Sequence, residues 1–134
     1  MFRQLDEKTS VAGQIRPADV PALAAQGFRM IINNRPDGEA PGQPDGEEIR
    51  AAAEAAGIAY RAIPVRQLDP GAVAQTGRAL DEAEGPVLAF CAAGTRSTYL
   101  WALARSAQGA DADDLVQLAF AAGVDLEPIR RFLR

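Results

Sequence analysis

Short apolar segments alternate with helix-like segments along most of the chain, and this alternation limits the possible folds more than any other feature. Three segments have the character of strands: Phe28–Asn33, Ile58–Val65 and Val87–Phe90. The last is a continuous apolar run, which is typical of a strand buried on both faces of a parallel sheet. Strands that alternate with helices predict βαβ units. We therefore expect one α/β domain over residues 1–134, with a parallel central sheet flanked by helices on both faces.

Glycine, proline and capping residues mark where the intervening helices begin and end. Asp69 and Asp111 stand where N-caps are expected, and Pro17 and Pro70 suit a first helical turn. Helices are expected over Pro17–Gln26, Glu47–Ala56, Pro70–Glu84, Ser97–Gln108 and residues 112–121, with a short one after Asp125. Three prolines and three glycines in the twelve residues Arg35–Gly46 predict an irregular loop. The length of this loop points to a functional role.

The amino-acid composition excludes several classes of function. The chain has no histidine and one cysteine, Cys91. Without histidine there can be no Ser-His-Asp triad, Cys-His pair or His-ligated metal site. A single cysteine allows no intrachain disulfide and no zinc knuckle. We expect neither a metal nor a cofactor, and the net charge of −4 argues against a nucleic-acid partner.

No segment of the sequence has the character of an export signal or a membrane span. The first ten residues lack the basic and then apolar profile of a signal peptide. No stretch of about 18 apolar residues is free of charge. A lone free cysteine suits a reducing compartment. These patterns predict a cytoplasmic enzyme without a membrane partner, and they leave the oligomeric state open.

The segment Cys91–Ser97 joins the third predicted strand to a helix, and its residue types suit nucleophilic chemistry. A thiol attacks only as a thiolate, and its pKa falls at helix N-termini and beside cations. Gly94 lets the backbone amides turn inward to form an anion nest. Arg96 can hold an oxyanion through two parallel hydrogen bonds. Cys91 is therefore the predicted nucleophile and Arg96 the predicted anion ligand, although a lone cysteine is often only a small buried apolar residue.

Other residues are predicted to contribute to the same site. The predicted substrate-binding residues are Ala92, Ala93, Gly94, Thr95, Ser97 and Arg35. The positive charge of Arg35 could instead pair with Glu47 or Glu48. Asp69 and Asp37 follow strand ends and are candidates for a general acid. Each has a simpler interpretation, Asp69 as a helix cap and Asp37 as a turn residue.

The motif Cys-x-x-Gly-x-Arg-Ser resembles the active loop of single-domain rhodaneses. It also resembles the Cys-x5-Arg loop of protein tyrosine and dual-specificity phosphatases, shortened by one residue. Over nearly the whole chain the sequence resembles the bacterial "beta-lactamase hydrolase-like protein, phosphatase-like domain" family. The segments that carry this likeness are Ser10–Ile15, Gly27–Gly38, Ile63–Val65, Gly85–Leu88, Gly94–Ser97, Leu100–Leu103 and Ala122–Leu126.

The resemblance implies a fold like that of protein tyrosine and dual-specificity phosphatases, with Cys91 as nucleophile, Arg96 as oxyanion ligand and Gly94 at the turn of the loop. Phe90 stands where tyrosine phosphatases usually have histidine, so one support for the thiolate is missing. The six-residue loop from Cys91 to Arg96 also has one donor fewer than a phosphatase loop, whereas a persulfide needs a smaller cradle.

Three functions remain open on these patterns. Sulfane-sulfur transfer between a donor and an external thiol acceptor is slightly favoured. Hydrolysis of a phosphomonoester is the first alternative, and a non-catalytic module that binds a small anion is the second.

Overall fold

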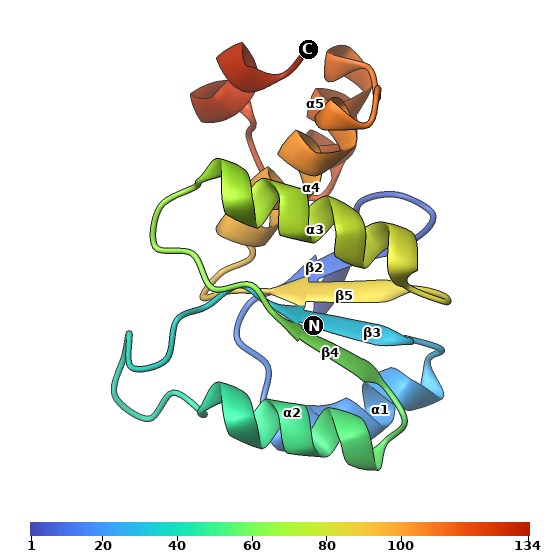
Figure 1. Ribbon diagram of the computed structural model, residues 1–134, viewed down its shortest axis with the longest axis vertical. Helices are drawn as coiled ribbons and strands as arrows, with labels where there is room; N and C mark the ends of the chain where they lie inside the picture. The colour runs from blue at the N-terminus through green and yellow to red at the C-terminus, as the bar shows by residue number, and fades with distance from the viewer.

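The computed structural model describes residues 1–134 as one mixed sheet between two layers of helices (Figure 1). The strands are β1 (Phe2–Gln4), β2 (Thr9–Ala12), β3 (Met30–Asn33), β4 (Ala59–Ala62) and β5 (Val87–Phe90). The helices are η1 (Pro17–Asp19), α1 (Val20–Ala25), α2 (Gly46–Ala55), α3 (Pro70–Glu82), α4 (Thr95–Ala107), α5 (Ala112–Ala121) and η2 (Glu127–Phe132), of which η1 and η2 are 3-10 helices. The predicted α/β class with helices on both faces is confirmed.

The sheet has the order β1-β2-β5-β3-β4. Strands β2, β5, β3 and β4 run parallel, whereas β1 pairs antiparallel with β2. The predicted parallel central sheet is confirmed in these four strands, and β1 adds an antiparallel edge strand that was not expected. No strand was predicted before Phe28, so β1 and β2 were both missed. β1 has only three residues, all at least partly exposed, so no apolar period marks it.

The two faces of the sheet bury two separate clusters, because successive strand residues point to opposite sides. In β5, Val87 and Ala89 join the cluster under α3, α4, α5 and η2. Leu88 and Phe90 join the cluster with α1 and α2. This two-sided burial explains why β5 is a continuous apolar run.

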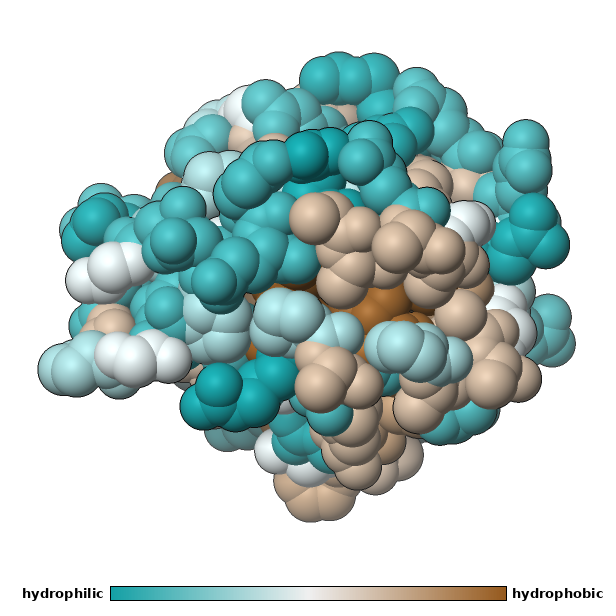
Figure 2. Space-filling model, turned by 90° about the horizontal axis from the view of Figure 1, so that it is seen from below, coloured by the Kyte–Doolittle hydropathy of each residue, from teal (hydrophilic) through white to brown (hydrophobic).

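The outer surface of α1 and α2 is rich in small apolar residues. Figure 2, seen from this side, shows apolar residues gathered from the centre to the lower edge of the view, and hydrophilic residues over much of the rest. Ala51 and Ala55 of α2 are exposed there, whereas the large exposed apolar side chains all lie outside α1 and α2.

Loops from different strands meet at the carboxyl edge of the sheet, where ligands of such folds bind (Figure 1). Backbone hydrogen bonds continue the pairing past the strand ends. The backbone amide of Asn34 donates to the Phe90 carbonyl at 2.8 Å, and the backbone amide of Val65 donates to the Asn34 carbonyl at 3.0 Å. The chain segments after β3, β4 and β5 therefore remain side by side as they leave the sheet.

Candidate active site

The loop after β5 turns sharply into α4 at Gly94. This residue is the N-cap of α4 and has a φ of 96°, a backbone conformation that residues other than glycine rarely adopt. Helix α4 begins at Thr95, two residues before the predicted start, because the turn at Gly94 already orients the chain for the helix. The residues Cys91–Ser97 consequently wrap around the N-terminal end of α4.

The carbonyl groups of this loop are held on its outer side. The amide of Gln14 donates to Ala92 O at 3.2 Å, and Nη2 of Arg3 donates to Ala93 O at 3.0 Å. The Gly94 carbonyl accepts from the amide and the hydroxyl of Thr98 at 3.0 and 2.8 Å. Because the C=O and N–H of one peptide group point in opposite directions, these bonds turn the following amides inward. The loop thus has the form of an anion nest.

Cys91 lies at the centre of the nest, with only 1% of its surface exposed. Burial raises the pKa of its thiol, but hydrogen bonds from the backbone and side chain of Ser97 and from the amides of Ala93 and Gly94 outweigh burial and lower the pKa overall. The Gly94 amide donates to Sγ at 3.1 Å. The site therefore stabilises the thiolate more than an ordinary cysteine environment does, without a neighbouring histidine.

The hydroxyl of Ser97 has one proton and two possible acceptors, Oδ1 of Asn34 and Sγ of Cys91. The hydroxyl donates to Oδ1 of Asn34 at 2.8 Å. Nδ2 of Asn34 in turn donates to the Ile63 carbonyl at 2.9 Å, which fixes the orientation of the Asn34 side chain. A hydroxyl donates only one proton, so it cannot serve Asn34 and the thiolate together. The backbone amides are therefore the constant donors to Cys91, and Ser97 is a donor that must rotate to reach it.

Arg96 presents one edge of its guanidinium to an acidic partner and keeps another edge free. Nη1 and Nη2 donate to the two carboxylate oxygens of Glu39 at 2.8 and 2.9 Å, and Nη1 also donates to Val65 O at 3.0 Å. A guanidinium has five N–H donors, so Nε–H and one Nη2–H remain. These two lie on the same edge and form a planar fork suited to an oxyanion.

Glu39 is held between two arginines, and it was not among the predicted site residues. Its carboxylate pairs with Arg96 and also accepts from Nε of Arg35 at 3.1 Å. The hydrogen bond from Arg96 is the main cause that lowers the pKa of Glu39 to about 2, against the opposing effect of burial. Glu39 lies in the long loop that the proline and glycine content singled out, which was the one available signal.

Arg35 joins the site through Glu39 and through Gln14, whose Oε1 accepts from Nη1 at 3.1 Å. The alternative pairing of Arg35 with Glu47 or Glu48 is wrong. Glu47 pairs with Arg50, and Glu48 accepts from the backbone amide of Asp45. Gln14 is a second site residue that was not predicted. Its backbone amide binds the Ala92 carbonyl of the nest, and its side chain accepts a hydrogen bond from Arg35.

The two candidate acids are both bound to helix N-termini. Asp69 is exposed and its carboxylate accepts from the Ala72 amide at 2.9 Å as the N-cap of α3. Asp37 is also exposed, and its carboxylate accepts from the Gly46 amide at 2.8 Å. No hydrogen bond or ion pair joins either carboxylate to Cys91 or Arg96. The remaining predicted binding residues of the loop, Ala92, Ala93 and Thr95, are exposed at its rim.

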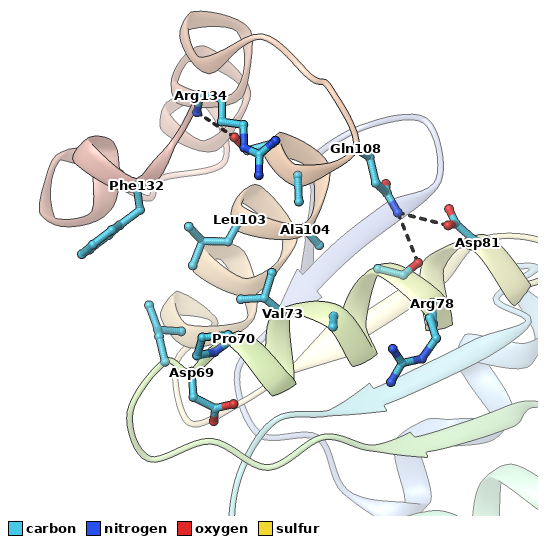
Figure 3. Close-up of a pocket in the computed structure, with 15 residues that line it drawn as sticks. Asp69, Pro70, Val73, Arg78, Asp81, Leu103, Ala104, Gln108, Phe132 and Arg134 are labelled. Carbon is cyan, nitrogen blue, oxygen red and sulfur yellow. Dashed lines mark hydrogen bonds between the residues drawn. The ribbon is translucent and has the colours of Figure 1, made fainter.

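A groove with a volume of about 750 Å³ lies elsewhere, between α3, α4 and the C-terminal segment (Figure 3). Apolar side chains such as Val73, Leu103 and Phe132 line it, and the Cys91 loop does not contribute to it. The chain contains no cluster of three metal-ligating side chains. None of its helices combines the length and the apolar character needed to cross a membrane.

Solved structures with the same fold place the chain in a class. A candidate phosphatase from Neisseria meningitidis Z2491 superposes with a TM-score of 0.81 at 40% identity, over 96% of this chain and 93% of that one. Tk-PTP gives 0.74 at 15% identity over 98% and 91% of the two chains. TpbA of P. aeruginosa, solved in complex with pTyr, gives 0.67 at 20% identity over 98% and 79%. The chain is thus a phosphatase-like α/β protein.

A family model narrows this class. The "Beta-lactamase hydrolase-like protein, phosphatase-like domain" model matches residues 1–110, so the chain belongs to that family, as its sequence motifs predicted. A beta-lactamase hydrolase-like protein of Agrobacterium fabrum (strain C58) is 40% identical over 133 residues, which are 97% of this chain and 31% of that protein. The chain therefore spans about a third of the length of the curated relatives it matches.

Proposed function

We propose that the chain is a cysteine-dependent enzyme in which the Cys91 thiolate attacks a small anionic substrate. The observation that carries the proposal is the Gly94 amide 3.1 Å from Sγ, in a loop whose Ala92, Ala93 and Gly94 carbonyls are bound on its outer side. The free fork of Arg96 supplies the complementary cation. Together these groups bind negative charge that develops beside the sulfur.

Sulfane-sulfur transfer is the reaction that we favour for this site. The Cys91 thiolate attacks the outer sulfur of thiosulfate, the S–S bond of the donor breaks, and sulfite leaves with the electron pair. An external thiolate then attacks the outer sulfur of the Cys91 persulfide and regenerates the Cys91 thiolate. Since the chain has one cysteine, no internal disulfide can replace this external acceptor.

Two features of the site support sulfur transfer. The loop from Cys91 to Arg96 has six residues, which makes a smaller cradle than the three oxygens of a transferring phosphoryl group need. Asp69 and Asp37 are bound to helix N-termini and contact neither Cys91 nor Arg96, so neither predicted acid is positioned as a general acid. Sulfur transfer to a thiolate does not require such an acid.

Hydrolysis of a phosphomonoester is the second candidate function. Its support is the likeness to the Neisseria protein, described as a candidate phosphatase, and to TpbA, which was solved with pTyr. In this reaction the thiolate attacks phosphorus, the alcohol leaves, and water releases phosphate from the phosphocysteine. A reducing compartment such as the cytoplasm suits either reaction, because both begin from a free thiolate.

Intact-mass measurement separates the two reactions. The chain is incubated with thiosulfate and, in parallel, turnover of p-nitrophenyl phosphate is recorded. We expect a mass gain of one sulfur that cyanide removes, with weak phosphatase turnover. The variant Cys91→Ser controls for sulfur bound elsewhere. Efficient phosphate release without any sulfur on Cys91 would replace sulfur transfer by phosphate hydrolysis. Activity that survives in Cys91→Ser would refute the covalent role of Cys91.

A further inference from the structure

Arg3, on the edge strand β1, links two segments that are far apart in the sequence. Its Nη2 donates to Ala93 O and its Nη1 donates to Ala122 O, both at 3.0 Å. The first acceptor belongs to the Cys91 loop, and the second is the C-cap residue of α5. Arg3 forms no ion pair with any carboxylate. Both of its side-chain hydrogen bonds go to backbone carbonyls, and the Ala122 carbonyl lies at the negative end of the α5 dipole.

The backbone at both ends of this link leaves room for the guanidinium. A Cβ added at Gly94 would lie 2.5 Å from Nη2 of Arg3, and one added at Gly123 would lie 3.3 Å from Nη1. Both glycines have positive φ, 96° and 88°. Arg3 is therefore packed directly against the turn of the loop and the turn after α5.

We propose that Arg3 is a positioning residue that orients the peptide group between Ala93 and Gly94 and so aims the Gly94 N–H at Cys91. This inference rests on the proposed function of the Cys91 loop. The Ala93 carbonyl and the Gly94 N–H belong to one planar peptide group and point in opposite directions. Arg3 holds the oxygen on the outside at 3.0 Å, while the hydrogen on the inside donates to Sγ at 3.1 Å.

The same contact couples the loop to the C-terminal part of the chain. Ala122 lies beyond residues 1–110, which the family model matches, and Arg3 connects it to the nest. A displacement of α5 would remove one of the two carbonyls that fix the guanidinium. The orientation of the Gly94 amide, and with it the reactivity of Cys91, thus depends on where α5 ends.

The experiment measures the thiol itself, so it does not depend on which reaction the enzyme performs. Alkylation of Cys91 by iodoacetamide is followed across pH for the wild type, Arg3→Met and Arg3→Lys, with and without sulfate. The control is Arg61→Met. Arg61 lies on β4, the strand at the opposite edge of the sheet, and pairs with Glu82 of α3. Thermal unfolding of each variant shows that it is folded.

We expect the alkylation midpoint of Arg3→Met to rise by about half a pH unit, because the thiolate loses part of one hydrogen bond. Protection by sulfate should weaken about threefold, since the same amide faces the anion. Arg3→Lys has one donor nitrogen where Arg3 uses two, Nη1 and Nη2, so it should lie between the wild type and Arg3→Met. Arg61→Met should match the wild type.

The outcomes separate the inference from the proposed function. If the alkylation midpoint and the sulfate protection of Arg3→Met equal those of the wild type, the positioning role is wrong. If Arg3→Met fails to fold, Arg3→Lys decides, and wild-type behaviour of that variant in both measurements overturns the proposal. A wild-type thiol with an ordinary pKa would refute the activated nucleophile of the proposed function, whereas the sulfate arm still tests Arg3.

Discussion

Two loops at the carboxyl edge of the sheet build the candidate site by opposite means. The loop after β5 has alanines at Ala92 and Ala93 and supplies backbone amides. The loop after β3 is longer and supplies charged side chains, of which Glu39 reaches Arg96. In the function proposed above, the short loop therefore sets where an anion binds, while the long loop sets the direction of the Arg96 guanidinium through Glu39.

The strongest way to break this division of roles is Arg96→Lys. An ammonium group cannot pair with both oxygens of Glu39 and also offer a planar fork to the substrate. We expect turnover to fall by about 100-fold, the size of effect found when a preorganised charge partner is lost. Steady-state kinetics of the active reaction measures this. Arg66→Lys, on an exposed residue without a recorded hydrogen bond, is the matched control, and an equal loss there would contradict the role of Arg96.

Glu39→Gln tests the long loop alone. The amide can accept from only one nitrogen of Arg96, because its own NH2 group faces a donor. We expect turnover to fall by about tenfold, as the fork of Arg96 becomes less well oriented. Glu47→Gln removes an exposed carboxylate paired with Arg50 and should leave turnover unchanged. Full activity of Glu39→Gln would show that Arg96 is held by the short loop and Val65 alone.

The pH dependence of stability gives a third test of the same contact. The pKa of Glu39 is lowered from 4.5 to about 2, so its ion pairs stabilise the fold fully above pH 4.5. This contribution is lost as the pH falls towards about 2. We expect the difference in unfolding free energy between the wild type and Glu39→Gln to be constant at neutral pH and to shrink over that range. Urea titrations across pH measure it, and a difference independent of pH would contradict the pairing.

The smallest effect is expected at the two capping carboxylates. Asp69→Ala should reduce the unfolding free energy by about 1 kcal/mol, as the loss of an N-cap does, and Asp37→Ala should do so by a similar amount or less. Turnover should remain within about twofold, because neither carboxylate contacts Cys91 or Arg96. Loss of one limb of the pH–rate profile in either variant would instead identify a general acid and would strengthen the phosphatase alternative.

The sequence predicted the parts of this molecule that depend on local pattern. The strand β5, the caps Asp69 and Asp111, and the turn at Gly94 follow from apolar runs and from residues with special backbone or capping properties. The likeness to a family identified the phosphatase-like class. These features involve residues close together in the chain, where hydrophobic period and turn chemistry carry the information.

The contacts that complete the site could not be predicted in this way. Glu39 lies 57 positions from Arg96, in a loop without periodicity, and Arg3 lies 90 positions from Ala93. Their partners are set by how the loops meet after folding. The strands β1 and β2 were missed for a related reason, since short segments with polar residues become strands here through pairing with neighbours.

The depth of Cys91 has a consequence for the direction of attack on a loaded enzyme. The inner sulfur is buried, while Ala92 and Ala93 are exposed at the mouth of the nest. A persulfide places its outer sulfur about 2 Å nearer that mouth, one S–S bond away. An approaching thiol meets this terminal atom first and is shielded from the inner one. In the proposed sulfur transfer, this geometry favours delivery of the outer sulfur over formation of a mixed disulfide, and delivery leaves Cys91 as a free thiolate.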